Sequence, residues 1–488
     1  MTNLLRASNR IHLVGIGGIG LSAIARVLHG QGLQVSGSDQ NPSELAQELI
    51  AEGIPVRDGH RADWVAGADL VIVSSAIPEN NPEIVEAKRQ GIPVARREQI
   101  LGELTENKVT IAVAGAHGKT TTSAMIAWIL DQAGLDPTYV VGGVLQNLGT
   151  NARVGEGPHF VIEADEYDRA FLGIRPNIAI VTTLEHDHPD CYPTFDEMRA
   201  AFREFADGIV ADGLLIVCGD DVEARRLGEW FSGRGRRVER YGLDQGWDWW
   251  AAGAHLGNHA VFEVGHKSSA NNGKRLGSCA LQVPGRHNVL NALAALAASS
   301  EAGVGFETAA AALTRFQGTA RRFQYKGQAE GITVVDDYAH HPTEVRATLE
   351  AAQLKYPGRA IWAVFQPHTY SRTAAMLTDF AASFGDADHV IVTSIYAARE
   401  QNLLNISGHD LIAAMDHPDA RYAETLESAV SMLLARLQSG DVVITLGAGD
   451  SHLIGERVLE GIRTADNGKG RGRNGKAQTQ GAESPAWG

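Results

Sequence analysis

One stretch of the chain combines the residue types that bind the phosphates of a nucleotide. Residues 108–122 read Lys-Val-Thr-Ile-Ala-Val-Ala-Gly-Ala-His-Gly-Lys-Thr-Thr-Thr. The β-branched run predicts a buried strand, and the turn from Gly115 to Gly118 lets backbone N–H groups close around phosphate oxygens. Lys119 could reach the β- and γ-phosphates, and the Thr120 hydroxyl is placed to bind Mg²⁺. The stretch therefore predicts an ATP site.

This phosphate loop departs from the full G-x-x-x-x-G-K-[ST] pattern at one position. The pattern would place glycine at position 113, where this chain has Val113. The backbone amides of the first helical turn, which includes Thr121, add to the field that attracts phosphate. The loop alone does not identify the reaction, because motors, kinases, switches and ligases all use one.

Acidic and histidine side chains follow the next two predicted buried strands. The first group is Glu163-Ala-Asp165-Glu166-Tyr-Asp168, and the second is Glu185-His186-Asp187-His188. Ligands of open α/β sheets bind at the carboxyl ends of the strands. Mg²⁺ prefers hard oxygen ligands, with histidine as an occasional nitrogen ligand. The two groups therefore predict a magnesium site, with a solvated acidic rim as the alternative.

A second glycine turn lies near the N-terminus. Gly15-Ile-Gly17-Gly18-Ile-Gly20 has the dinucleotide-binding pattern between a strand and a helix, and Asp39 follows about 20 residues later, where it could accept from a ribose hydroxyl. Taken alone, the turn suits NAD and a nicotinamide-dependent oxidoreductase. It suits any other nucleotide diphosphate equally well. The pattern therefore predicts a pyrophosphate site and leaves its ligand open.

Further polar residues stand at the start of an alanine-rich helix. The segment Gly285-Arg-His287-Asn288-Val-Leu-Asn291 precedes Ala292 to Ala302. The Asn291 amide could pair with the donor and acceptor edge of adenine. His287 and Asn288 could equally be helix caps.

Two dense polar groups follow buried strands in the last third of the chain. They are Asp336-Asp337-Tyr338-Ala-His340-His341-Pro-Thr-Glu344 and Phe365-Gln-Pro-His368-Thr-Tyr-Ser-Arg372-Thr. Such His, Arg and Tyr side chains suit the binding of a carboxylate and an amine, because arginine makes bidentate contacts. Zinc at His340, His341 and His368 is the competing interpretation. Adjacent histidines point in different directions, which disfavours zinc.

Short strands and helices alternate along three segments, which predicts an α/β fold of three domains. We expect a Rossmann-like domain in residues 1–107, a central phosphate-loop domain with a mixed sheet in 108–319, and a Rossmann-like domain in 320–463. Residues 247–284 read as a β-rich excursion of the central domain. Residues 464–488 are Gly-rich, polar and basic, and we expect them to be disordered.

The overall composition is typical of a soluble globular protein. Of 488 residues, 44% are hydrophobic and 21% charged, and the formal charge of −15 disfavours nucleic acid or an anionic membrane as partner. Three widely spaced cysteines suggest neither a disulfide framework nor a zinc site. A signal segment and a run of about 18 apolar residues are both missing from the sequence. We expect a cytoplasmic enzyme without membrane insertion.

The order of these motifs closely resembles that of the Mur ligases, over residues 10 to about 462. The variant loop with Val113 is the usual form in that family. The resemblance implies a UDP-sugar domain, a central ATPase domain, and a C-terminal domain that binds the amino acid and closes over the nucleotide. It also implies ATP and Mg²⁺, and ligation of L-alanine to UDP-N-acetylmuramate through an acyl phosphate in peptidoglycan precursor synthesis. The protein would be a monomer or a homodimer.

The resemblance also implies roles for single residues. Lys119 and Thr120 resemble the family's phosphate and Mg²⁺ groups, Glu163 its first metal carboxylate, and His188 the ligand of a second metal. For ATP it adds Asn291 at adenine, Arg322 near the phosphates, and Asp337. Tyr338, His340, His368 and Arg372 resemble the amino-acid side of the site, with His340 and Arg372 among the catalytic groups. The residues expected at the UDP-sugar are Gly15, Gly17, Gly18, Gly20, Ser38, Asp39, Ser74 and Ser75.

Two departures bear on the branch of the family. The chain has no lysine between Lys119 and Lys267, so the carbamylated lysine of several sibling ligases has no counterpart, as expected of the alanine-adding branch. Tyr167, where alanine-adding enzymes often have serine, instead resembles the branch that attaches the tripeptide L-Ala-γ-D-Glu-diaminopimelate. The N-terminal glycine turn and the Phe365 to Arg372 motif favour alanine.

Overall fold

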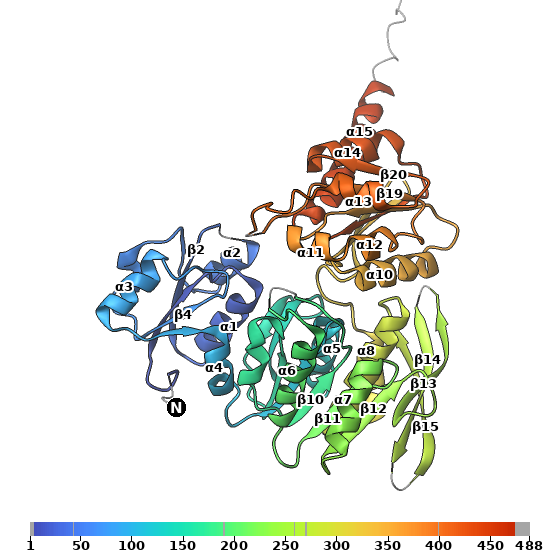
Figure 1. Cartoon of the computed structure of the whole chain (residues 1–488). Helices are drawn as coiled ribbons and strands as arrows, with labels where there is room; N and C mark the ends of the chain where they lie inside the picture. Colours follow the sequence, from blue (N-terminus) through green and yellow to red (C-terminus); the bar gives the residue numbers. More distant parts are fainter. Residues whose placement is uncertain are drawn as a thin grey trace, which may run out of the picture. The chain divides into compact units, whose positions relative to one another are not determined.

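The computed structural model describes residues 4–41, 43–188, 191–257, 259–268, 271–398 and 400–473. The chain divides into two compact units, of which the first is Met1–Phe323 with Glu350–Lys355 and the second is Gln324–Leu349 with Tyr356–Gly488. The first unit contains two sheets and the second unit contains one (Figure 1).

The N-terminal sheet is parallel, with the strand order β3-β2-β1-β4-β5. Strand β1 is buried after the exposed Arg10, and its residues are apolar except for His12, as expected of a parallel strand covered on both faces. The strands are β1 (Arg10–Val14), β2 (Gln34–Asp39), β3 (Val56–Asp58), β4 (Leu70–Val73) and β5 (Val94–Arg96). The helices are α1 (Ile19–Gly30), α2 (Glu44–Ala51), η1 (Ala62–Val65), α3 (Pro82–Gln90) and α4 (Arg97–Leu104).

The central sheet is mixed, in the order β15-β14-β13-β12-β11-β10-β6-β9-β7-β8. Its parallel part runs from β13 to β7, and β14, β15 and β8 pair antiparallel. The strands are β6 (Val109–Ala114), β7 (Thr138–Leu145), β8 (Thr150–Arg153), β9 (His159–Glu163), β10 (Ile178–Val181), β11 (Leu214–Cys218), β12 (Arg237–Gly242), β13 (Trp249–Leu256), β14 (Ala260–Ser268) and β15 (Asn271–Leu281). The helices are α5 (Lys119–Gln132), η2 (Tyr167–Gly173), α6 (Phe195–Asp207), α7 (Val222–Ser232), α8 (Arg286–Glu301) and α9 (Phe306–Thr314).

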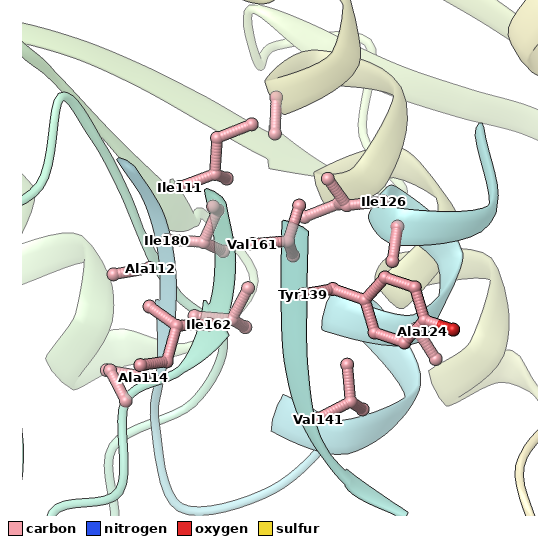
Figure 2. Packing of buried hydrophobic residues seen from close by; sticks show 14 of the residues in the cluster. Ile111, Ala112, Ala114, Ala124, Ile126, Tyr139, Val141, Val161, Ile162 and Ile180 are labelled. Carbon is pink, nitrogen blue, oxygen red and sulfur yellow. The ribbon is translucent and has the colours of Figure 1, made fainter. Parts of the chain in front are cut away.

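The core of the first unit holds the phosphate-loop strand and helix in place. Ile111 on β6, Val161 on β9 and Ile180 on β10 pack toward Ile126 of α5 and Tyr139 of β7 (Figure 2), and all are at most 1% exposed. Burial of one such side chain contributes roughly 1.5–3 kcal/mol, so this packing fixes the end of β6 and the start of α5.

Helix α1 joins the two sheets of this unit. Its residues Leu21 to Leu28 are all buried, and it packs on β2 and also on β7 and β8 of the central sheet. Arg26 donates to Asn151 at 2.5 Å, and Asn151 donates to the carbonyl of Ile19 at 3.0 Å. A helix whose residues are buried over two full turns needs partners on both sides. The N-terminal and central sheets therefore share one hydrophobic cluster.

The second unit has a sheet of order β16-β17-β21-β18-β19-β20, antiparallel only at β16. Its strands are β16 (Gln324–Ala329), β17 (Ile332–Asp337), β18 (Ile361–Phe365), β19 (His389–Thr393), β20 (Ala420–Ala423) and β21 (Val442–Leu446). The helices that follow Phe323 are α10 (Pro342–Lys355), α11 (Tyr370–Ala375), α12 (Leu377–Ala381), α13 (Gly408–Ala414), α14 (Leu426–Arg436) and α15 (Ser451–Arg473).

The predicted α/β class, with a mixed central sheet between two largely parallel ones, is confirmed. The disordered tail was predicted to begin at Thr464, but helix α15 extends past this position to Arg473. Buried Ile454, Val458 and Leu459 anchor the helix. An existing helix extends more easily than a new one forms, because each added hydrogen bond requires only one more residue to be fixed. The rest of the predicted tail, residues 474–488, lies outside the described residues. No helix in the described part of the chain is long and apolar enough to cross a membrane.

Candidate active site

The phosphate loop lies between β6 and α5, as predicted. Gly115 and Gly118 have φ angles of +128° and +81°, which L-residues rarely adopt. A β-carbon on Gly115 would also collide with the backbone of Thr182, 2.9 Å from its nitrogen. The two glycines thus allow the backbone to turn tightly, and Lys119 becomes the first residue of α5. The N-terminal amides of α5 face the turn, where an anion would bind.

Lys119 contacts Glu166, a buried carboxylate of the first predicted acidic group to which no individual role was assigned. Its Nζ donates to Glu166 Oε1 and to the carbonyl of Gly115, each at 2.7 Å. The Glu166 side chain is fully buried and that of Lys119 is 13% exposed. Burial raises the pKa of Glu166 to about 7, against the opposing effect of Lys119. Glu166 therefore changes charge near neutral pH beside the phosphate-binding lysine.

Glu166 should make the stability of the protein depend on pH. A carboxyl whose pKa is raised from 4.5 to about 7 by folding stabilises the native state fully below 4.5, and the contribution is lost as pH rises through about 7. We expect Glu166→Gln to reduce the loss of unfolding free energy between pH 5 and 8, by up to about 3 kcal/mol at about 1.4 kcal/mol per pKa unit.

Denaturant unfolding at both pH values measures the effect. Glu204→Gln, on the exposed face of α6, is the matched control and should keep the wild-type dependence. An unchanged dependence in Glu166→Gln would contradict a titrating Glu166.

Thr120 and Glu163 lie together, as a shared metal site requires. The Thr120 hydroxyl donates to Glu163 Oε1 at 3.1 Å, and the N–H of Gly142 on β7 donates to Oε2 at 2.7 Å. Glu163 is the last residue of β9, which neighbours β6 in the sheet. The hydroxyl and carboxylate oxygens are hard donors at the carboxyl end of parallel strands, so the residues present fit Mg²⁺.

His188 lies near the same oxygen of Glu166 that Lys119 contacts. Its Nε2 is 3.7 Å from Glu166 Oε1 and 3.6 Å from Asp187 Oδ2, and its ring meets the edge of Tyr167 with centroids 5.0 Å apart. The backbone of His188 has φ +56°, an uncommon conformation for a non-glycine residue. His188 therefore belongs to the same acidic cluster as Lys119, while its role as a ligand of a second metal stays a prediction.

His117 in the phosphate loop pairs with Glu185, and neither residue was among the predicted site residues. The pair joins His117 Nε2 to Glu185 Oε1, and the His117 N–H donates to Thr183 Oγ1 at 3.0 Å. This contact links the loop to the segment after β10. Glu185 and His188 stand in one motif, but only the folded chain reveals which of the two faces the loop.

Asn291 lies against the phosphate loop. A β-carbon on Gly118 would come within 2.5 Å of Asn291 Oδ1, and the Asn291 amide donates to Asn288 at 3.1 Å. Asn288 in turn donates to the carbonyl of Pro284 at 2.6 Å. The N-cap of the helix is Gly285, so the alternative of a cap at His287 or Asn288 is wrong. The helix begins at Arg286, earlier than the predicted alanine run. Adenine contact by Asn291, and phosphate contact by half-buried Arg322, stay predictions.

The N-terminal glycine turn is closed by Asp39. The Gly17 N–H donates to Asp39 Oδ2 at 2.9 Å, and Gly18 is the N-cap of α1. Gly15 has φ +83°. A β-carbon on Gly20 would lie 2.6 Å from Nη1 of Arg97, a residue of α4 that no motif indicated. The turn therefore presents the free N–H groups of α1, which suit a diphosphate.

Of the three serines predicted at the UDP-sugar, Ser38 makes its side-chain contacts inside the protein. Its side chain is fully buried and donates to both oxygens of Glu83 at 2.9 Å, and Glu83 also contacts His12 at 2.7 Å and His60 at 2.9 Å. The carbonyl of Ser38 accepts from the Gly15 N–H at 2.8 Å, so the backbone of Ser38 stabilises the glycine turn. Ser74 and Ser75 follow β4 at the same edge of the sheet, and their ligand contacts stay predictions.

The second unit brings three of its four predicted amino-acid-side residues together. The His340 ring meets Tyr338 and His368 edge-on, with centroids 5.2 and 5.6 Å apart, and its Nδ1–H donates to the carbonyl of Tyr338 at 3.0 Å. Arg372 is a buried residue of α11. Asp337, at the end of β17, accepts from the Ala339 N–H at 2.8 Å. The hydrogen bond of His340 occupies its Nδ1, which is one fewer nitrogen for the competing zinc interpretation.

A glycine turn at the end of β1, a Lys-Thr phosphate loop between β6 and α5, and a carboxylate at the end of β9 define a nucleotide-binding α/β protein of the phosphate-loop class. Three family profiles match it in order: "Mur ligase family, catalytic domain" over residues 10–109, "Mur ligase middle domain" over 113–299, and "Mur ligase, glutamate ligase domain" over 321–449. The chain belongs to the Mur ligase family.

Several relatives resemble the chain over nearly its whole length. The UDP-N-acetylmuramate–L-alanine ligase of Solibacter usitatus is 45% identical over 463 residues, which are 94% of this chain and 96% of that one. The crystal structure of the UDP-N-acetylmuramate-alanine ligase of Thermotoga maritima is 30% identical with a TM-score of 0.78, over 93% of this chain and 99% of that one. A murein peptide ligase structure from Psychrobacter arcticus is 27% identical with a TM-score of 0.71, over 93% and 98%. The three-domain α/β fold of this family is therefore established for the chain.

Proposed function

We propose that the protein is an ATP-dependent ligase that joins L-alanine to UDP-N-acetylmuramate, giving UDP-N-acetylmuramoyl-L-alanine, ADP and phosphate. The observation that carries the proposal is the 45% identity to an alanine ligase across 94% of the chain. The phosphate loop and its neighbouring carboxylates supply the groups that such a reaction needs. Membership of the Mur ligase family leaves the nicotinamide-dependent alternative without support.

The reaction proceeds in two steps. An oxygen of the muramate lactyl carboxylate attacks the γ-phosphorus of ATP while the bond to the β,γ-bridging oxygen breaks, so ADP leaves and an acyl phosphate forms. The alanine nitrogen then attacks the acyl carbon, the carbon–oxygen bond to phosphate breaks, and the nitrogen loses a proton. Amide formation from a free carboxylate needs this activation because a carboxylate is a poor electrophile.

The residues of this chain act mainly by position and charge. Lys119, at the start of α5, stabilises the charge that develops on the transferred phosphoryl group, together with the loop amides. Its contact with Glu166 orients the ammonium group before ATP binds. Thr120 and Glu163 would hold Mg²⁺, which supplies positive charge to the β- and γ-phosphate oxygens when bound. Asp337, Tyr338, His340, His368 and Arg372 are proposed to bind nucleotide and amino acid from the second unit.

A substrate omission assay tests the function. ADP and phosphate should appear only when UDP-N-acetylmuramate, ATP and L-alanine are all present, and mass spectrometry should detect the amide product. Release of ADP without the sugar nucleotide, or no product with all three substrates, would overturn the proposal. Glycine and L-serine in place of alanine measure acceptor selectivity.

A second acceptor is favoured by one observation. The murein peptide ligase of Psychrobacter arcticus has the same fold over 93% of this chain, and Tyr167, the residue that resembles its branch, lies 5.0 Å from the ring of His188. The same assay with the tripeptide L-Ala-γ-D-Glu-diaminopimelate distinguishes the two acceptors. Product with the tripeptide and none with alanine would assign the chain to peptide ligation.

The substrates are small molecules, and we propose that the enzyme meets them in the cytoplasm, where ATP and nucleotide-activated sugars are made. Cys218 and Cys279 are buried and form no disulfide in the part of the chain that the structure describes, which suits a reducing compartment. We propose a monomer or a homodimer, which sedimentation analysis can distinguish.

A further inference from the structure

The strongest unassigned group of the first unit is the guanidinium of Arg97, which lies between the two nucleotide-binding turns. Its Nη2 donates to Asp165 Oδ2 at 2.8 Å, two residues after the end of β9. Its Nη1 stands 2.6 Å from the point that a β-carbon on Gly20 would occupy. One side chain thus touches the acidic cluster of the phosphate-loop domain and the first turn of α1.

The position of Arg97 is fixed by close packing of its helix. Helix α4 packs on η2, and a β-carbon on Gly102 would lie 2.7 Å from the carbonyl of Gly173. Gly173 in turn approaches the carbonyl of Glu98 too closely for a side chain. Because the two glycines bring the backbones into contact, Arg97 at the start of α4 has little freedom to move away from Asp165.

The guanidinium keeps donors for a ligand. Among the residues that the structure describes, no acceptor receives a hydrogen bond from Nη1 or Nε of Arg97, and the side chain is 27% exposed. The hydrogen bond from Nη2 to Asp165 Oδ2 joins two oppositely charged groups, and it anchors this end of the guanidinium. The remaining N–H groups lie beside the free amides of α1, where negative charge is stabilised.

We propose that Arg97 binds the diphosphate of the UDP-sugar at the N-terminal turn, and that Asp165 orients it for this contact. The proposal rests on the proposed function, which makes a UDP-sugar the ligand of that turn. Planar arginine suits phosphate because its N–H groups form two parallel bonds, which lysine does not. This contact also explains the glycine at position 20, because a side chain there would displace the guanidinium of Arg97. Arg97 is then a substrate-binding residue that also couples the UDP-sugar turn to the acidic cluster.

Calorimetric titration with UDP and with uridine tests the contact without catalysis. We expect Arg97→Lys to weaken UDP binding roughly tenfold or more, since charge-assisted hydrogen bonds are lost, while uridine affinity stays within about twofold. Arg96→Lys is the matched control, because Arg96 points to Glu79 at 2.5 Å and should leave both affinities unchanged. In turnover, Arg97→Lys should raise KM for UDP-N-acetylmuramate and leave KM for ATP nearly constant.

Gly20→Ala gives an independent perturbation that leaves Arg97 in the chain. Position 20 is helical and the nearest atom is the flexible end of a side chain, so the fold should tolerate alanine. We expect weaker UDP binding and no additional loss in the double variant Gly20→Ala/Arg97→Lys, because both changes remove one contact. Equal loss of UDP and uridine affinity, or unchanged UDP affinity in either folded variant, would overturn the role of Arg97. Wild-type protein that binds no UDP would instead overturn the proposed UDP-sugar site.

Discussion

Replacement of Lys119 by alanine is expected to lower kcat by roughly 10²-fold or more, since one preorganised charge at a developing phosphoryl transition state has an effect of this size. The structure adds a second consequence. Glu166 is fully buried and Lys119 is the cation that it contacts at 2.7 Å. Without Lys119 the carboxyl should take up a proton, so the variant should fold and still fail in catalysis. Steady-state rates of ADP release measure the loss.

Lys108 provides the control for this experiment. It precedes the same strand β6 at the opposite end, where its Nζ donates to the carbonyl of Gly157 at 2.7 Å. Lys108→Ala therefore removes a lysine from the far end of the same strand and should keep kcat within about twofold, as expected of a substitution away from the site. A kcat for Lys119→Ala that matches that of Lys108→Ala would remove Lys119 from phosphoryl transfer.

The phosphate loop was predictable from the sequence because its causes are local. A β-branched run before Gly115 predicts a buried strand, and a Lys-Thr pair after Gly118 predicts a helix start. The N-terminal glycine turn was predictable for the same reason. The contact of Asp39 with the Gly17 N–H was not predicted, and its contact with a ribose hydroxyl stays a prediction. Each of these features depends on residues that are near one another in the chain or within one βαβ unit.

The pairing of distant charges was not predictable in the same way. Lys119 with Glu166, and Arg97 with Asp165, meet only because α4 packs on η2 and β6 lies beside β9. Ser38 was assigned to the UDP-sugar from the family resemblance, and in the structure its hydroxyl donates to Glu83. A strand end shows where polar side chains lie close together. Whether one of them binds a ligand or another side chain depends on packing that a single sequence does not reveal.

The division of the chain has a similar origin. Three α/β segments predicted three domains, and the family profiles match three regions, whereas the first two sheets form one compact unit. The reason is α1, which is buried from Leu21 to Leu28 and serves both sheets. The available signal was the predominance of apolar residues in this stretch, where only Ser22 and Arg26 are polar. The domain borders at residues 107 and 319 stay predictions. The hydrophobic core that the first two sheets share does not show where one domain ends and the next begins.

The metal-binding prediction separates two side chains of the acidic cluster. Glu163→Gln keeps the size of the side chain and removes its charge, so it should raise the Mg²⁺ concentration needed for half-maximal activity and lower kcat by roughly 10²-fold, as loss of a preorganised catalytic group does. His188→Ala should leave ATP affinity nearly intact and impair the step that activates the muramate carboxylate. The geometry supports this difference, because Glu163 contacts the Thr120 hydroxyl whereas His188 lies beside Glu166.

A Mg²⁺ titration of ADP release with each variant measures the difference. His159, on the same strand as Glu163 but at its other end, provides the control His159→Ala, which should keep the wild-type Mg²⁺ dependence. Full activity of His188→Ala at every Mg²⁺ concentration would mean that this histidine only packs against Tyr167, and the second-metal assignment would be wrong. An unchanged Mg²⁺ requirement in Glu163→Gln would have a larger consequence, because the Thr120 hydroxyl would then need another carboxylate as its partner in the metal site.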